Sequence, residues 1–148
     1  MILLKKILIL EDNLLVLSKL LANLEVLEQD QPYSLSLTIL TDSQQVEDYI
    51  NNNPKADFDV IILDADCKIN ESFHILDFER FGAEKVISIS SVPKHNENAK
   101  KRGVSRIILK DIHDYDGFAK KVVDTVKEII STEKSFKYPT REEKIHLR

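Results

Sequence analysis

The sequence has little of several features that mark common protein classes. Its one cysteine, Cys67, cannot form an internal disulfide, which agrees with a reducing compartment. No apolar run approaches the length of a membrane span, and the first residues lack the small-residue cleavage site of a signal peptide. The formal net charge of −4 gives no electrostatic footprint for nucleic acid. These absences predict a cytoplasmic protein that binds neither a membrane nor nucleic acid directly.

The composition favours one folded domain. The chain has 148 residues, of which 43% are hydrophobic and 31% charged, a mixture that argues against disorder. No internal repeat or low-complexity block interrupts it. We expect a single domain over residues 1–131, followed by a charged C-terminal extension or linker over 132–148. A frayed tail with no role is the simpler interpretation of that last segment.

The most informative stretch is an apolar run that ends in carboxylates. The run from Val60 to Leu63 is continuous in apolar character and rich in β-branched residues, as in a strand buried on both faces of a parallel sheet. Asp64 follows it directly, and Asp66 comes two residues later. A carboxylate in this place lies at the carboxyl edge of the sheet, where open α/β folds bind their ligands.

Strand and helix patterns alternate along the rest of the chain. The apolar patterns predict strands over 6–10, 33–41, 60–63, 85–89 and 105–109. They predict helices from Leu14 to Leu27, around 46–50, over 72–81, over 93–102 and from Phe118 to Ile130. The strand over 33–41 has a mostly polar second face and fits an edge of the sheet, and the helix over 93–102 is polar and thinly anchored. The expected class is α/β, with a doubly wound, five-stranded parallel sheet and helices on both faces.

Polar side chains follow four of the predicted strands. Glu11 and Asp12 end the first strand, Asp64 the third, Ser90 the fourth, and Lys110 the fifth. Crowded carboxylates repel one another and raise each other's pKa unless a cation relieves them, and hard oxygen ligands suit Mg²⁺. Lys110 could balance the remaining charge and pair with a phosphoryl oxygen, while the Ser90 hydroxyl could contact the same group. This is the outline of an aspartyl-phosphate site.

This set of strand ends resembles the receiver domain of two-component response regulators. Residues 6–13 resemble its first strand with an acidic pair, and 59–64 the strand that carries the phosphoacceptor. Residues 87–91 resemble the strand that ends in the switch hydroxyl, and 103–110 the last strand with its lysine. The resemblance covers residues 5–130 and implies a flavodoxin-like sheet with the strand order 2-1-3-4-5.

The resemblance implies a role for each acidic residue. Asp64 would accept a phosphoryl group from a phosphohistidine on a sensor histidine kinase or a phosphotransfer protein. Asp12 and Asp64 would hold Mg²⁺ directly, Glu11 through water, and Asp66 through its backbone carbonyl. Such a domain is a signalling phosphoacceptor, and its own catalysis is limited to phosphotransfer to itself and autodephosphorylation.

The resemblance also implies a switch. Phosphorylation would act through Ser90 and Lys110 and change the surface of the fourth helix, fifth strand and fifth helix. That surface would bind a downstream effector protein or an output domain outside this sequence. Two copies could pair through the last helix. The sequence does not name the kinase, the signal or the output.

Three positions depart from the family pattern. Lys68 stands where the family usually has a proline, and the segment between Asp64 and Lys85 is shorter than usual. Ile107 occupies the place of the switch aromatic, and Asp111 replaces the proline that usually follows the lysine. These changes predict a divergent receiver with intact chemistry and an altered readout.

Two other interpretations stay open. A pseudo-receiver would keep the fold and respond to protein contacts alone, but its mark would be the loss of Asp12, Asp64 or Lys110, which are all present. The second alternative rests on Asp64-Ala65-Asp66, which resembles the Asp-x-Asp motif of haloacid-dehalogenase phosphatases. That motif normally lies on the first strand of its domain, and those enzymes add an acidic pair after a later strand.

Overall fold

The computed structural model describes residues 2–30, 32–66 and 75–132, and its centre is a sheet of parallel strands. The strands are β1 (Leu3–Leu10), β2 (Tyr33–Leu40), β3 (Val60–Asp64), β4 (Val86–Ser90) and β5 (Arg106–Leu109). Their order is β2-β1-β3-β4-β5, and every neighbouring pair is parallel. The predicted five-stranded parallel sheet with order 2-1-3-4-5 is therefore confirmed.

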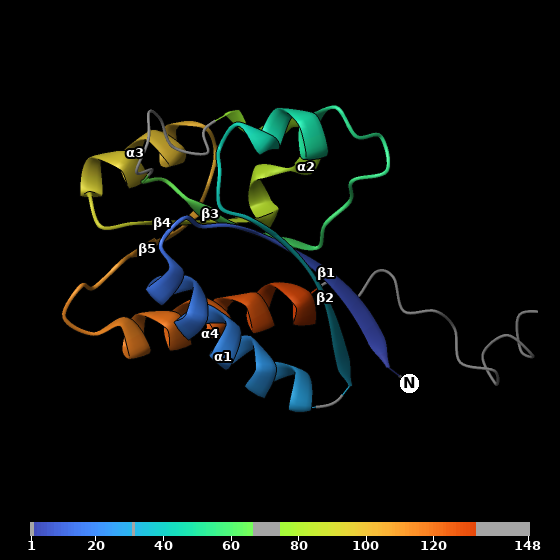
Figure 1. Ribbon diagram of the computed structural model, residues 1–148, viewed down its shortest axis with the longest axis vertical. Coiled ribbons are helices and arrows are strands. Elements are labelled where there is room, and N and C mark those ends of the chain that lie inside the picture. Colours follow the sequence, from blue (N-terminus) through green and yellow to red (C-terminus); the bar gives the residue numbers. More distant parts are fainter. Residues whose placement is uncertain (1, 31, 67–74, 133–148) are drawn as a thin grey trace, which may run out of the picture.

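Helices cover both faces of this sheet (Figure 1). One face carries α1 (Leu14–Gln29) and α4 (Tyr115–Thr132). The other face carries the π-helix η1 (Val46–Asn51), the one-turn α2 (Phe78–Phe81) and α3 (Pro93–Lys101), with the short 3₁₀ helix η3 (Ala83–Lys85) before β4. Because side chains alternate along a strand, each strand serves two cores. In β3, Ile62 packs under α1 and α4, whereas Ile61 and Leu63 pack under the opposite layer.

The position of each strand explains its sequence. All five residues of β3 are buried, because β1 and β4 flank it and helices cover both of its faces. The strand β2 lies at the edge of the sheet, as its alternating pattern predicted, and both Leu37 and Ile39 remain 37% exposed there. The sequence pattern thus located the central strand and this edge correctly.

The part of the β3–β4 connection that the structure describes, residues 65–66 and 75–85, contains only short helical segments. The predicted helix over 72–81 is shorter in its described part, because only Phe78–Phe81 is α-helical there and residues 72–74 lie outside the described residues. Gly82 follows with a φ of 87°, a conformation that favours glycine, so the chain turns there as expected. The Arg80 guanidinium donates hydrogen bonds to the carbonyl oxygens of Ile50, Asn51, Asn53 and Ala56. It therefore holds the end of η1 and the loop that leads into β3.

The helix α3 rests on the sheet through few residues. Only Asn96 and Ala99 are buried in it, and no side chain caps its N-terminus, where Pro93 is the first residue. The Ser88 hydroxyl donates to Asn96 Oδ1 at 2.9 Å, and Asn96 Nδ2 donates to the carbonyl of Ile108 at 3.4 Å. This helix is therefore attached to β4 and β5 mainly by hydrogen bonds.

The predicted C-terminal extension, residues 132–148, lies outside the described residues from residue 133 onward. Among the helices that the structure describes, none has both the length and the apolar character that crossing a membrane requires.

Candidate functional site

The polar residues predicted at the strand ends lie together at one edge of the sheet. Asp64 and Ser90 are the last residues of β3 and β4, while Glu11 and Lys110 directly follow β1 and β5. All four side chains are buried, and Asp64 and Glu11 expose no surface at all. Polar groups at this depth need charged or hydrogen-bonding partners, so their contacts define the site.

Lys110 provides the positive charge in this cluster. Its Nζ lies 2.9 Å from Asp64 Oδ1 and 3.0 Å from Glu11 Oε2. Its backbone N–H donates to the carbonyl oxygen of Ser90 at 2.8 Å, which fixes the end of β5 beside β4. One ammonium group thus serves two buried carboxylates, and the cluster retains one unbalanced negative charge when both are ionised.

The pKa values of these groups follow from that imbalance. Burial and, to a lesser extent, the nearby Glu11 together raise the pKa of Asp64 to about 8, although Lys110 opposes both effects. Burial likewise raises the pKa of Glu11. Burial alone would lower the pKa of Lys110, but the two carboxylates outweigh it and raise that pKa. A further cation at this point would stabilise both carboxylates in their charged form.

The donor set fits a divalent metal ion. Glu11, Asp12 and Asp64 each offer an oxygen, and these oxygens lie within 4.8 Å of one another. Asp64 Oδ2 is buried and accepts no hydrogen bond from the described residues, so this strong acceptor oxygen could serve as a ligand. Hard oxygen ligands with room for water are what Mg²⁺ requires.

Asp66 is placed differently from the other acidic residues. Its backbone N–H donates to Asp64 Oδ1 at 2.8 Å, which orients that carboxylate. Its own carboxylate accepts hydrogen bonds from the Ser90 hydroxyl and from the backbone N–H and hydroxyl of Ser91, and it lies 2.7 Å from His95 Nδ1. Its side chain therefore points toward α3 and is not one of the three clustered carboxylates.

These contacts also explain the acidity of Asp66. Burial by itself would raise its pKa, but the hydrogen bonds from Ser90, Ser91 and His95 together outweigh burial and lower the pKa below its usual value. The carboxylate is therefore negatively charged at neutral pH.

The Ser90 hydroxyl is directed to Asp66 and not to Asp64. It lies 2.5 Å from Asp66 Oδ1 and 2.9 Å from the carbonyl oxygen of Val92. It also accepts a hydrogen bond from the backbone N–H of Val92 at 2.9 Å. The sequence pattern correctly predicted that Ser90 ends its strand, but the direction of the Ser90 hydroxyl depends on Asp66.

His95 is a residue of this site that the sequence pattern did not predict. It is separated from Asp66 by 29 positions and lies in the first turn of α3. The available signal was its place in the helix that directly follows the strand end at Ser90.

Of the departures from the family pattern, Lys68 lies outside the described residues, and Ile107 is partly buried against the core under α3. Asp111 is exposed, and its side chain accepts a hydrogen bond from the backbone N–H of His113.

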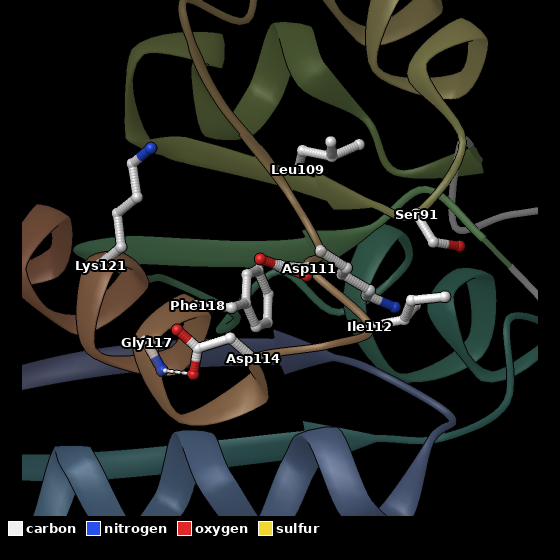
Figure 2. Close-up of a pocket in the computed structure, with 9 residues that line it drawn as sticks. Ser91, Leu109, Asp111, Ile112, Asp114, Gly117, Phe118 and Lys121 are labelled. Atoms are coloured by element: carbon white, nitrogen blue, oxygen red, sulfur yellow. Dashed lines mark hydrogen bonds between the residues drawn. The ribbon is translucent and has the colours of Figure 1, made fainter.

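A cavity of about 850 Å³ opens beside Lys110, between the end of β5 and the start of α4 (Figure 2). Its lining includes the apolar side chains of Leu109, Ile112 and Phe118 together with the charged Lys121. Leu109 is 53% exposed and Ile112 is 61% exposed. The acidic cluster therefore adjoins an open and partly apolar surface.

Solved structures of response regulators share this fold. The phosphorylated cyanobacterial phytochrome response regulator RcpA is 16% identical, with a TM-score of 0.67 over 93% of this chain and 100% of that one. A response regulator receiver domain from Rhodospirillum rubrum is 14% identical, with a TM-score of 0.67 over 83% of this chain and 94% of that one. The Mn²⁺-bound form of the response regulator Rcp1 is 15% identical, with a TM-score of 0.64 over 92% and 99%.

Comparisons of sequence, unlike those of structure, find no related protein. No protein-family model matches the chain, and no curated protein matches it. The likeness is therefore one of fold, and the chain has the fold of response regulator receiver domains, as the resemblance of its strand ends implied.

Proposed function

We propose that the chain is a phosphoacceptor receiver domain, in which Asp64 takes a phosphoryl group from a phosphohistidine. The donor would be a sensor histidine kinase or a phosphotransfer protein. The observation that carries this proposal is the buried Asp64 carboxylate, with Lys110 on one oxygen and no hydrogen-bond partner among the described residues on the other. A reactive carboxylate needs one oxygen available for the incoming phosphorus atom.

The transfer would replace a phosphorus–nitrogen bond of the donor with a phosphorus–oxygen bond on Asp64. An oxygen of Asp64 forms the new bond to phosphorus while the bond between phosphorus and the imidazole nitrogen breaks, and the imidazole leaves with the electron pair. Lys110 Nζ, which lies 2.9 Å from Asp64 Oδ1, would remain close enough to pair with a phosphoryl oxygen. Hydrolysis of the resulting acyl phosphate by water would return Asp64 to its resting form.

Glu11, Asp12 and Asp64 would hold Mg²⁺, with Glu11 acting through water and the backbone carbonyl of Asp66 as a further ligand. When bound, the ion would neutralise charge shared by the carboxylates and the phosphoryl group. The acceptor left over on Asp64 supports this assignment. Two of the structural neighbours were solved in a Mn²⁺-bound form and in a phosphorylated form, respectively.

The output would use the surface of α3, β5 and α4. This surface contains the exposed apolar side chains of Val92, Leu109 and Ile112, which suit a protein partner. The partner would be a downstream effector protein or a separate output domain, and two copies could also pair through α4. This role would place the protein in the cytoplasm, where the kinase domains of such systems act.

A pseudo-receiver is the second candidate, because the Ser90 hydroxyl is bound to Asp66 and not directed to Asp64. Incubation with acetyl phosphate and Mg²⁺, read on a phosphate-affinity gel, separates the two functions. We expect a shifted band for the wild type and for the control Asp48→Asn, whose side chain is exposed on η1. Asp64→Asn should give no shifted band. A wild type that neither shifts nor responds to beryllofluoride would favour the pseudo-receiver.

A further inference from the structure

The carboxylate of Asp66 joins the end of β4 to the first turn of α3. It accepts hydrogen bonds from the Ser90 and Ser91 hydroxyls, and its Oδ1 lies 2.7 Å from His95 Nδ1. The Asp66 side chain is 23% exposed and that of His95 is 41% exposed. The contact thus lies at the rim of the site, where solvent screens it only in part.

The chemistry of these side chains determines which of them donates each hydrogen bond. An ionised carboxylate can only accept hydrogen bonds, so the hydrogen must be on His95 Nδ1. The Ser90 hydroxyl has a single hydrogen, and its two acceptors are Asp66 Oδ1 and the Val92 carbonyl. While these contacts persist, Ser90 has no hydrogen left for an oxygen on Asp64.

The start of α3 depends on the same contacts. This helix has no side-chain cap at its N-terminus, and its buried residues, Asn96 and Ala99, lie further along. The hydrogen bond from His95 to Asp66 therefore connects this first turn to the segment that directly follows β3. Ile107 occupies the position of the aromatic ring that, in the family pattern, rotates together with the switch hydroxyl. The chain therefore has a branched aliphatic side chain there, partly buried against the core.

We propose that His95 is a positioning residue, which holds Asp66 in the orientation that binds the Ser90 hydroxyl and so favours the resting state. This inference rests on the proposed function and names how the same site is regulated. A phosphoryl group on Asp64 would compete for the Ser90 hydroxyl and for Lys110, and it would repel the Asp66 carboxylate. The release of Asp66 would free His95, and with it the first turn of α3.

Beryllofluoride with Mg²⁺, as a phosphoryl mimic, provides the first test. Because the His95 contact exists only in the resting state, His95→Ala should bind beryllofluoride about threefold more tightly than the wild type. His95→Asn keeps a nitrogen donor near the position of Nδ1 and should keep the wild-type affinity. The exposed His113, in the loop after β5, gives the control His113→Ala, which should also match the wild type.

The tautomer of His95 provides a spectroscopic test. In ¹⁵N spectra recorded where the imidazole is neutral, the resting protein should show the hydrogen on Nδ1, although free imidazole side chains prefer it on Nε2. The signal is assigned by its loss in His95→Asn. Addition of beryllofluoride should move the hydrogen to Nε2. A resting protein with the hydrogen on Nε2 would overturn the contact itself.

Hydrogen exchange separates this inference from the proposed function, because it needs no phosphoryl mimic. The amides of residues 94–101 should exchange faster in His95→Ala than in the wild type or in His95→Asn. A wild type that binds beryllofluoride, together with a His95→Ala variant that binds it no more tightly, overturns the role of His95 alone. A wild type that binds no beryllofluoride overturns the proposed function, and the regulatory role with it.

Discussion

Asp64 and Lys110 form a buried ion pair of 2.9 Å, although Asp64 ends β3 and Lys110 follows β5, two strands that do not pair with each other. The strand β4 lies between β3 and β5, so the lysine side chain reaches across the end of a whole strand to the carboxylate. Glu11, which follows β1, meets the same ammonium group. Lys110 therefore links the ends of three strands.

Loss of Lys110 should destabilise the protein. Lys110→Ala leaves two buried carboxylates without their cation, so we expect the free energy of unfolding to fall by about 3 kcal/mol at pH 8. At pH 5 the loss should be smaller, because the carboxylates can take up protons there. Urea unfolding at both pH values measures the effect, and the exposed Lys120, as Lys120→Ala, is the control. An equal loss at both pH values would contradict the electrostatic origin.

The stability of the metal-free protein should fall as the pH rises. The pKa of Asp64 is about 8 in the folded state, against an ordinary value of 3.8, so the folded state binds more protons than the unfolded state between these values. Its favourable contribution is fully present below pH 4 and is lost as the pH rises toward 8. Asp64→Asn should flatten this part of the profile, measured by urea unfolding with a chelator present.

Binding of Mg²⁺ should depend on pH in the opposite sense. The ion needs the ionised form of Asp64, so its affinity should rise by up to about tenfold per pH unit below pH 8 and level off above it. Calorimetry in buffers of different ionisation enthalpy should detect a released proton. An affinity that does not change between pH 6 and pH 8 would contradict the raised pKa.

Asp12 should contribute to metal binding more than to stability. It is only partly buried, unlike Glu11 and Asp64, and it belongs to the cluster of oxygens within 4.8 Å. Asp12→Asn should weaken Mg²⁺ binding about tenfold, because one ligand charge is lost. The midpoint of urea unfolding without metal should change little. If both quantities stay at the wild-type value, Asp12 is not a ligand.

Arg80 should matter for stability far from the site. Arg80→Ala removes hydrogen bonds to four backbone carbonyls around the end of η1, and we expect a loss of about 1.5 kcal/mol, limited by the exposure of the side chain. Arg80→Lys keeps the charge but not the planar fork, so it should recover only part of the loss. The neighbouring exposed Glu79, as Glu79→Ala, is the control.

The sequence predicted the sheet and its polar edge because both follow from the backbone. Apolar runs such as 60–63 locate buried strands, and parallel strands must bring residues such as Asp64 and Lys110 to the same edge. The end of the third helical segment was also predictable, since Gly82 adopts a positive φ there. These features need no knowledge of individual side-chain directions.

The contacts around Asp66 could not be predicted in the same way. Hydrophobic periodicity reports which backbone positions are buried, but it does not say which polar group a carboxylate will face. The partner His95 comes from a helix whose position is set by a buried amide, Asn96, and not by an apolar stripe. The fourth strand end was therefore predicted, while the direction of the Ser90 hydroxyl was not.

The edge strand has a consequence for how the protein behaves at high concentration. The eight residues of β2, Tyr33–Leu40, contain neither a charged residue nor a proline, and they expose Leu37 and Ile39. Sheets usually protect their outer strands with such residues, because unpaired amides and carbonyls there can template another chain. On partial unfolding, β2 is the place where strand-to-strand aggregation would begin.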